Sequence, residues 1–303
     1  MQTMHEVGLP ILCRQGLRSF REKTEARGRQ GKDPAVLWVL AMYLSFQSDV
    51  LALPIPPGTL FPPSGMQLWL DASDASTIVF NSNSSNVSQW NDKSGNGRNV
   101  FQTSTANQPF YDPNSLNSKN TIKFISGFNT LLSNLTSANL LQGVSGWTIF
   151  TVARSTNPTG NQNLCTICSD AAATASRASV QYGQVTNNTV SIRVRRLDAD
   201  AGANVEASSA FGLVYGYFTG RCSYDNTTGE IYENGVLMGI STTFLTSGIT
   251  STDNGSVGLG SRPDGAGINS LDGSIAEVLV YGSALSDGDR LLVEGYLKTK
   301  WGL

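Results

Sequence analysis

Apolar positions are distributed differently in three parts of the chain. Residues 1–33 show no convincing apolar period, residues 35–44 are apolar on every side, and from residue 66 onward short apolar runs alternate with turn formers. The short runs predict β-strands, at 67–70, 87–90, 121–124, 147–153, 164–167, 179–182, 190–194, 214–224, 230–233, 236–237, 256–259 and 274–281. Many short strands with turns between them predict a mainly β protein, built as a two-layer antiparallel β sandwich.

Helical periodicity in this main domain is confined to its C-terminal end. Ser286 is followed three residues later by Asp289, which is a variant of the capping box, and Gly302 supplies a stop. Between these residues apolar side chains recur about one turn apart, at Leu292, Val293, Tyr296, Leu297 and Trp301. The sequence therefore predicts a helix that closes the sandwich domain.

Several segments resemble one known family. The run from Gly273 to Tyr281 with its helix up to Leu303, the segment 68–74 (LWLDASD) and the segment 90–97 (WNDKSGNG) are similar to concanavalin A-like, laminin-G-like jelly-roll domains. The predicted hairpin at Asn234-Gly235 resembles the Tyr-x-Asn-Gly hairpin of the same domains. The resemblance implies a jelly roll over residues 66–303, of a kind found in bacteriophage structural proteins and bacterial surface proteins. Because the family is functionally broad, it implies a fold more than an activity.

The N-terminal part predicts an anchor. Residues 14–32 are rich in Lys and Arg, which fits either a solvated, partly helical arm or an arm that docks onto an acidic surface of a partner protein. Asp33-Pro34 is a helix start. A helix over the next ten residues spans roughly 15 Å, too short for a bilayer core of about 30 Å, so we expect no membrane span. We expect the helix to dock onto a partner subunit; packing on its own domain and a signal-like role are the alternatives. Its contact residues would be Val36, Leu37, Trp38, Leu40, Met42, Tyr43 and Leu44.

Prolines mark the predicted domain boundary. Five of the 11 prolines fall in residues 53–64, which predicts a semi-rigid extended linker. We therefore divide the chain into a basic arm with an apolar anchor helix (1–53), a Pro-rich linker (54–65) and the sandwich domain (66–303).

Charge and cysteine usage narrow the chemistry. The net charge of −2, with 15% charged residues, argues against nucleic acid as a partner. Among the four cysteines, Cys13, Cys165, Cys168 and Cys222, the CxxC pair at 165–168 lies in a strand-like run, where positions three apart face opposite sides. We expect these thiols to be small buried hydrophobes, with a zinc or redox role as the alternative. The one histidine, His5, lies in the arm, so the sandwich has no His-based site.

Carboxylate spacing argues against an enzyme. Glycan-cleaving members of the wider fold place acids at alternating strand positions, and no Glu-x-Asp-x-Glu pattern occurs in the sequence. Glu230 and Glu233 are three apart, and Glu277 lies alone in an apolar strand, where a structural pairing is expected. We therefore expect no catalytic residues and no required cofactor.

Calcium is the candidate metal of the predicted turns. Asp71, Asp74, Asn91, Asp92 and Asn96 are hard oxygen donors in predicted turns. The alternative, which we favour, is that these side chains cap the turns by bonding nearby backbone amides. A second set with the same interpretation is Asp253, Asn254, Asp264 and Asn269.

Aromatic and basic residues are the candidate glycan contacts. Trp69, Trp90 and Trp301 lie in the fold motifs or on the helix stripe, so we expect core roles for them. Loop residues would be better placed to bind a sugar, and the candidates are Tyr111, Tyr182, Arg195, Arg196 and Arg262.

Two hypotheses for function follow, with an enzyme as a distant third. The first is a non-enzymatic virion structural or decoration protein, anchored by residues 1–53 to other subunits of an assembly and displaying the sandwich on the virion surface. Its phage context rests on the resemblance alone. The second is a carbohydrate- or receptor-binding module, on a tail fibre or a secreted adhesin, whose partners are cell-surface glycans.

Overall fold

The computed structural model describes residues 61–303 except 83–84, 135–139, 158, 169–176, 184–187, 201–202, 209–213, 243–255, 264–266 and 268. The chain separates into two compact units, Met1–Pro54 and Ile55–Leu303, and all that follows concerns the second. The predicted arm, most of the linker and Cys13 lie outside the described residues. The same holds for the predicted anchor contacts Val36, Leu37, Trp38, Leu40, Met42, Tyr43 and Leu44.

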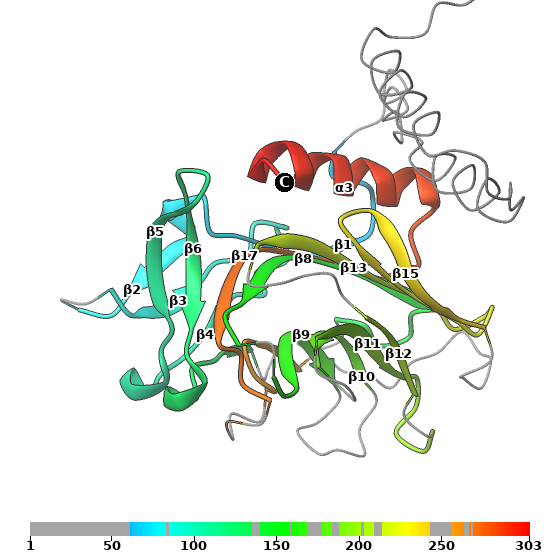
Figure 1. Ribbon diagram of the computed structural model, residues 1–303, viewed down its shortest axis with the longest axis horizontal. Helices are drawn as coiled ribbons and strands as arrows, with labels where there is room; N and C mark the ends of the chain where they lie inside the picture. Colours follow the sequence, from blue (N-terminus) through cyan, green and yellow to red (C-terminus); the bar gives the residue numbers. More distant parts are fainter. Residues whose placement is uncertain are drawn as a thin grey trace, which may run out of the picture. The chain divides into compact units, whose positions relative to one another are not determined.

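The described residues form two antiparallel sheets, as the sequence predicts (Figure 1). Sheet A follows the order β15 (Val236–Ser241), β14 (Thr228–Glu233), β13 (Gly216–Ser223), β8 (Gly146–Ser155), β17 (Gly273–Tyr281), β6 (Lys119–Phe124) and β5 (Phe110–Leu116), with β1 (Met66–Asp71) also paired to β17. Sheet B follows the order β12 (Ala203–Ser208), β11 (Thr189–Arg195), β10 (Arg177–Tyr182), β9 (Gln162–Cys168), β16 (Ser256–Leu259), β7 (Leu132–Asn134), β4 (Val100–Phe101), β3 (Val87–Trp90) and β2 (Ile78–Phe80).

The last strand in the chain, β17, occupies the middle of sheet A. It pairs with β8 along its length, from Gly273 to Tyr281. Its other edge is shared, because β6 pairs with residues 273–275 and β1 with residues 277–281. β17 therefore joins strands from the beginning and the middle of the domain.

The main core lies between the two sheets and follows the two-residue period of the strands. On β11, Val190, Ile192 and Val194 point into this core, so the residues between them face the other way. The same alternation separates the two cysteines of β9. Cys165 belongs to the core, whereas Cys168 is buried on the opposite face, which confirms that they are not placed to share a metal.

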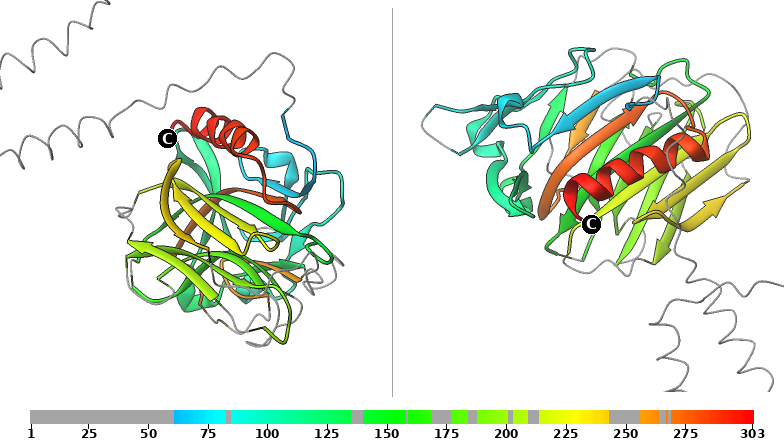
Figure 2. Two further views of the ribbon diagram at one scale, coloured as in Figure 1. Left: turned by 90° about the vertical axis from the view of Figure 1, so that its right-hand side faces the viewer. Right: turned by 90° about the horizontal axis from the view of Figure 1, so that it is seen from above.

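The C-terminal helix α3 (Asp287–Trp301) covers the outer face of sheet A and creates a second core (Figure 2). Val293, Leu297 and Trp301 pack on strand residues such as Phe150 and Leu279. Ser286 caps the helix by accepting from the N–H of Asp289, and Gly302 ends it in the left-handed region at φ +66°. The predicted helix, its cap and its stop are confirmed.

The hairpin at residues 233–236 also matches its prediction. Asn234 and Gly235 have φ values of +50° and +80°, as a two-residue type I′ turn requires. No helix among the described residues is long and apolar enough to cross a membrane.

Candidate binding surfaces

A buried carboxylate organises the contact between β17, β1 and α3. The side chain of Glu277 is 0% exposed. One of its oxygens, Oε1, accepts from Nε1 of Trp69 at 2.7 Å and from the hydroxyl of Tyr296 at 2.8 Å. The other, Oε2, accepts from Nζ of Lys300 at 2.9 Å and from Nε1 of Trp301. Burial raises the pKa of Glu277, against the lowering effect of Lys300. A carboxylate with every partner in place is structural, so the predicted pairing of Glu277 is confirmed.

The candidate calcium residues are engaged in turns and ion pairs. Lys93 contacts the carboxylates of both Asp71 and Asp74 at 2.9 Å, and Lys300 contacts Asp71 at 2.7 Å. Asp92 accepts backbone N–H groups of Trp69, Ser94 and Arg98, which fixes the turn after β3. Since ammonium and amide groups occupy the positions that a cation would need, we place no calcium site here.

The remaining calcium candidates follow the same pattern. The amide of Asn96 uses its nitrogen, which donates to the carbonyls of Met66 and Gln67 at 3.1 Å, and Asn91 accepts from the amide of Gln89. Among the described residues no group of three or more His, Cys, Asp or Glu side chains is arranged to hold a metal ion. In the second set only Asn269 is described; Asp253, Asn254 and Asp264 lie outside the described residues.

The ion pairs of Asp71 make the free energy of unfolding depend on pH in the acidic range. Burial acts to raise the pKa of Asp71, but the bonds from Lys300, Ser73 and Lys93 outweigh it, and the pKa lies below its ordinary value of 3.8. A lowered pKa in the folded state stabilises the fold above the unfolded value, and that stability is lost as the pH falls. We expect Asp71→Asn to flatten the fall in unfolding free energy between about pH 4 and pH 2.

Urea unfolding across this pH range measures the slope. The exposed Asp225, in the turn between β13 and β14, supplies the matched variant Asp225→Asn, which should keep the wild-type slope. An unchanged slope in Asp71→Asn would show that its lysine contacts do not stabilise the fold.

The structure distributes the five candidate glycan residues over distant parts of the domain. Tyr182 is not a loop residue: it ends β10 with 7% exposure, and its ring meets Phe218 edge-to-face at 5.3 Å, so that expectation is corrected. Tyr111 lies on β5 of sheet A, against the ring of Phe80. Arg196 is buried and its guanidinium lies 3.9 Å from the carboxylate of Asp200. Arg195 and Arg262 alone come together.

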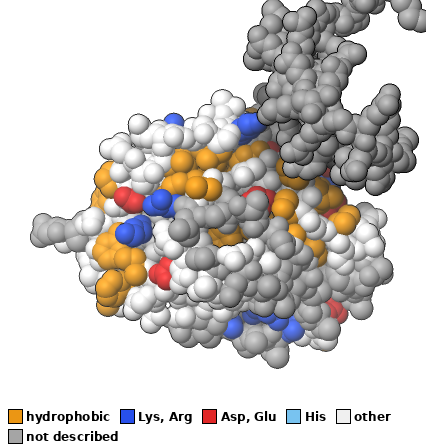
Figure 3. All heavy atoms as spheres, in the orientation of Figure 1, with side chains coloured by type: hydrophobic (Ala, Val, Ile, Leu, Met, Phe, Trp, Pro, Cys, Tyr) orange, Lys and Arg blue, Asp and Glu red, His pale blue; other side chains and the backbone are white. Residues whose placement is uncertain are grey.

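We call the surface they share the arginine face, formed by Arg177, Arg193, Arg195 and Arg262. Arg177 on β10 pairs across the strands with Arg195 on β11, and Ser179 pairs with Arg193. The positive charges are close enough to act on one another. Burial lowers the pKa of Arg193, and the neighbouring guanidinium groups of Arg195 and Arg262 lower it further. Blue side chains gather at the lower edge of Figure 3, on the side where Figure 1 shows β9 to β12.

Arg193 and Arg195 are partly exposed on this face. Within the described part of the chain, neither forms an ion pair with a carboxylate. Arg193 and Arg195 therefore place two like charges side by side on this face.

Hydroxyl groups accompany the arginines on the same side of sheet B. Thr166, Ser179 and Ser191 alternate with core residues along β9, β10 and β11, so they face away from the core. Their side-chain oxygens are buried, and among the described residues no hydrogen-bond partner is found for them. A buried hydroxyl without a hydrogen-bond partner costs about 1–3 kcal/mol of stability, so a row of three such groups is unusual.

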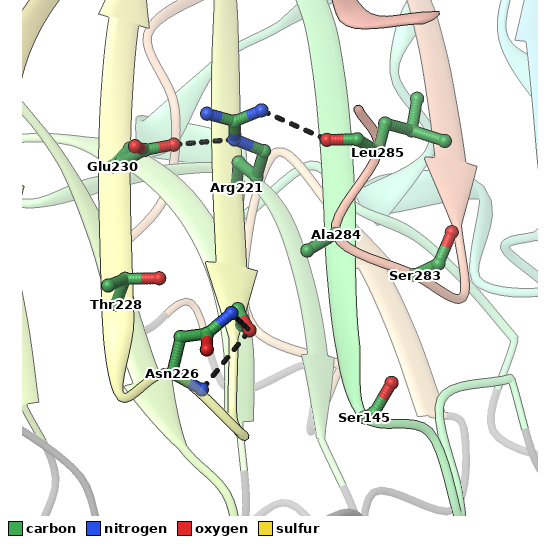
Figure 4. A pocket seen from close by; sticks show the side chains of 9 residues that line it. Ser145, Arg221, Asn226, Thr228, Glu230, Ser283, Ala284 and Leu285 are labelled. Carbon is green, nitrogen blue, oxygen red and sulfur yellow. Dashed lines mark hydrogen bonds and ion pairs between the residues drawn. The ribbon is translucent and has the colours of Figure 1, made fainter. Parts of the chain in front are cut away.

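A separate feature, a pocket, lies on the outer face of sheet A, beside the start of α3. This polar pocket has a volume of about 330 Å³. Arg221 of β13 and Glu230 of β14 form one wall as an ion pair (Figure 4). Small polar side chains and the connection from β17 to α3 form the rest, with Ser145, Asn226, Thr228, Ser283 and Ala284.

Comparison with known proteins identifies the fold. No family model matches the sequence, and no curated protein matches it. The receptor-binding domain of botulinum neurotoxin D is similar in structure, with a TM-score of 0.53 and 13% identity over 77% of this chain and 52% of that domain. The corresponding domain of the C/D mosaic serotype has a TM-score of 0.53 and 12% identity, over 77% of this chain and 51% of that domain. The CBM40 domain of the Ruminococcus gnavus IT-sialidase, bound to α2,3-sialyllactose, has a TM-score of 0.42 and 20% identity, over 50% of this chain and 84% of that domain.

The similarity to the two toxin domains shows the β-sandwich fold alone, because the sequence identities are 13% and 12%. The individual site has to be argued from this chain's own residues. The sequence pointed to two of the four arginines and missed Arg177 and Arg193. The signal for Arg193 was available: Arg193 and Arg195 are two apart in a strand whose alternate positions, Val190, Ile192 and Val194, are apolar, which places both arginines on the opposite face.

Proposed function

We propose that the sandwich domain is a carbohydrate- or receptor-binding module that binds acidic glycans on the arginine face. The observation that carries the proposal is the gathering of Arg177 on β10, Arg193 and Arg195 on β11 and Arg262 beyond β16, where the partly exposed Arg193 and Arg195 form no ion pair within the described residues. An anionic ligand would relieve the repulsion between these like charges.

The chemistry of the face matches a carboxylate- or sulfate-bearing sugar. A guanidinium presents planar, paired N–H donors that fit the two oxygens of such a group. An acidic sugar offers such a group, whereas a neutral sugar would leave the positive charges of Arg193 and Arg195 unmet.

The proposal is non-catalytic and extracellular. Three glutamates, Glu230, Glu277 and Glu294, are held in ion pairs, which supports structural roles for them. The toxin domains of similar fold are receptor-binding domains, a role in keeping with the proposal. A module that recognises glycans of a cell surface would be secreted or displayed outside the cell.

The virion decoration role stays a prediction. Its anchor, residues 36–44, lies outside the described residues, and its phage context rests on the sequence resemblance. Subunit partners and an assembly-bound state remain predictions for the same reason.

Glycan binding by charge variants tests the proposal. Isothermal titration of the full chain would compare sulfated heparin fragments, oligogalacturonates and sialyllactose with lactose and maltotriose. We expect an acidic ligand to bind, and the double change Arg193→Gln/Arg195→Gln to weaken it by at least about a hundredfold, because each of two lost charged hydrogen bonds contributes about 1.5–3 kcal/mol. Binding should also weaken as salt is raised.

Lys123→Gln on β6 removes an exposed positive charge from sheet A and should leave affinity unchanged. Binding of acidic and neutral ligands with equal affinity, or an acidic ligand held equally well by the double variant, would contradict the proposal.

A further inference from the structure

The polar pocket on sheet A is built differently from the arginine face, and it lies on the other outer side of the sandwich. Its wall residues Arg221, Thr228 and Glu230 belong to β13 and β14. We infer that this pocket is a second binding site, and that it takes an uncharged, hydroxyl-rich sugar unit. The inference goes beyond the acidic-glycan function and does not depend on it.

The walls of the pocket are fixed before any ligand arrives. The hydroxyl of Thr148 donates to the carbonyl of Ser283 and accepts the N–H of Leu285, both at 2.9 Å. A guanidinium nitrogen of Arg221 also donates to the Leu285 carbonyl at 2.9 Å, which ties β13 to the connection between β17 and α3 (Figure 4). A preformed site loses less conformational entropy when it binds.

Gly146 allows the backbone segments that line the pocket to approach one another closely. A Cβ added at Gly146 would overlap the carbonyl oxygen of Cys222 and lie 3.1 Å from the backbone nitrogen of Ala284. Only glycine therefore allows β8, β13 and the connection to α3 to approach so closely at this point. The volume of about 330 Å³ is at the lower end of the range of small-molecule sites.

Charge in the pocket selects against acids. Arg221 is held by two carboxylates, those of Glu230 and Asp287, so the group of three carries a net negative charge. An acidic sugar would be repelled by this negative charge, and the positive charge of Arg221 is already neutralised by its two carboxylate partners. The polar pocket and the arginine face therefore differ in the sign of the ligand charge that they accept.

The free polar atoms of the pocket are mainly acceptors and hydroxyls. Glu230 uses Oε2 for Arg221 and Tyr232, and within the described residues no bond is found to its second oxygen, Oε1. The hydroxyls of Ser145, Thr228 and Ser283 surround the same space, again with no partner for their Oγ atoms in the described part of the chain (Figure 4). Several sugar hydroxyls could donate to Glu230 Oε1 and accept from these groups at once.

Saturation-transfer NMR on the full chain tests the site with glucose, galactose, mannose and N-acetylglucosamine, and with glucuronate as the charged counterpart. We expect saturable binding of at least one neutral sugar and weaker binding of glucuronate. Thr228→Val, which keeps the shape and suits a strand, should weaken neutral binding about threefold to tenfold. Glu230→Gln should weaken neutral binding as well. The control variant Thr103→Val changes an exposed residue that does not line the pocket, so it should leave neutral binding unchanged.

No binding of any neutral sugar in the panel, or equal binding by wild type and Thr228→Val, would overturn the inference. Glucuronate bound more tightly than every neutral sugar would overturn it too. The double change Arg193→Gln/Arg195→Gln should leave neutral binding intact, so this site and the acidic-glycan site can fail separately.

Discussion

Replacement of Glu277 by alanine is expected to lower the unfolding free energy by about 3–5 kcal/mol, the usual cost of breaking a buried ion pair by removing one partner. The change removes one of the two carboxylates that pair with Lys300 and leaves it with Asp71 alone, and it leaves the indole N–H groups of Trp69 and Trp301 without acceptors. It also removes the carboxylate that joins β17 to the last turn of α3. Urea unfolding followed by tryptophan fluorescence would measure the loss.

The double change Glu277→Leu/Lys300→Met is the informative comparison. Removing both charges together leaves no unpaired ion, so the double variant should be more stable than Glu277→Ala. A loss below about 1 kcal/mol in Glu277→Ala would mean that the carboxylate is not held as the structure shows, since an exposed pair costs no more than that.

Gly260→Ala is expected to lower the unfolding free energy by about 2–5 kcal/mol. Gly260 follows β16 with φ +74°, and left-handed backbone costs a residue with a Cβ about 1–2 kcal/mol. The new Cβ would also overlap the ring of Phe124, which is 1% exposed and cannot move into solvent. Forcing such a ring aside adds about 1–3 kcal/mol. A thermal or denaturant unfolding curve would measure the sum.

Gly127→Ala supplies the matched control. A Cβ at Gly127 meets nothing within 4 Å, and its backbone lies outside the left-handed region, so stability should be almost unchanged. Equal stability of the two alanine variants would show that Gly260 does not lie against Phe124.

The elements that the sequence predicted best are those whose local signals agree with their burial. In the closing segment, β17 is apolar apart from Glu277, and α3 has its cap at Ser286 and its buried stripe at Val293, Leu297 and Trp301. The predicted core roles of Trp90 and Trp301 are confirmed, as both are 0% exposed. Local pattern and tertiary packing point the same way at these positions.

The strands that the sequence did not predict are short or polar. β4 has two residues, and β2 and β7 have three each, below the length at which alternation can be recognised. β5 reads FYDPNSL, with a proline and with Asn114 at φ +57°, so turn signals outweigh its strand signal. Pairing with longer neighbours, which local pattern does not reveal, makes these segments strands.

The candidate sites were harder to predict because they depend on which strands are neighbours. Arg177 and Arg195 lie 18 positions apart, and only the pairing of β10 with β11 brings them together. The polar pocket combines residues 145 to 285, from four separate segments. The sequence supplied the polar and charged side chains, but the topology decides which of them share a surface.

The central position of β17 has a consequence for the order in which the domain is made. Every other strand of sheet A precedes β17 in the chain, so β8 and β6 leave the ribosome before the strand that separates them. Until residues 273–281 emerge, those two strands present unpaired edges that can join the strands of another chain. Pairings so distant in sequence also form slowly. We therefore expect nascent chains of this protein to need protection late in synthesis, up to the moment when the final strand is released.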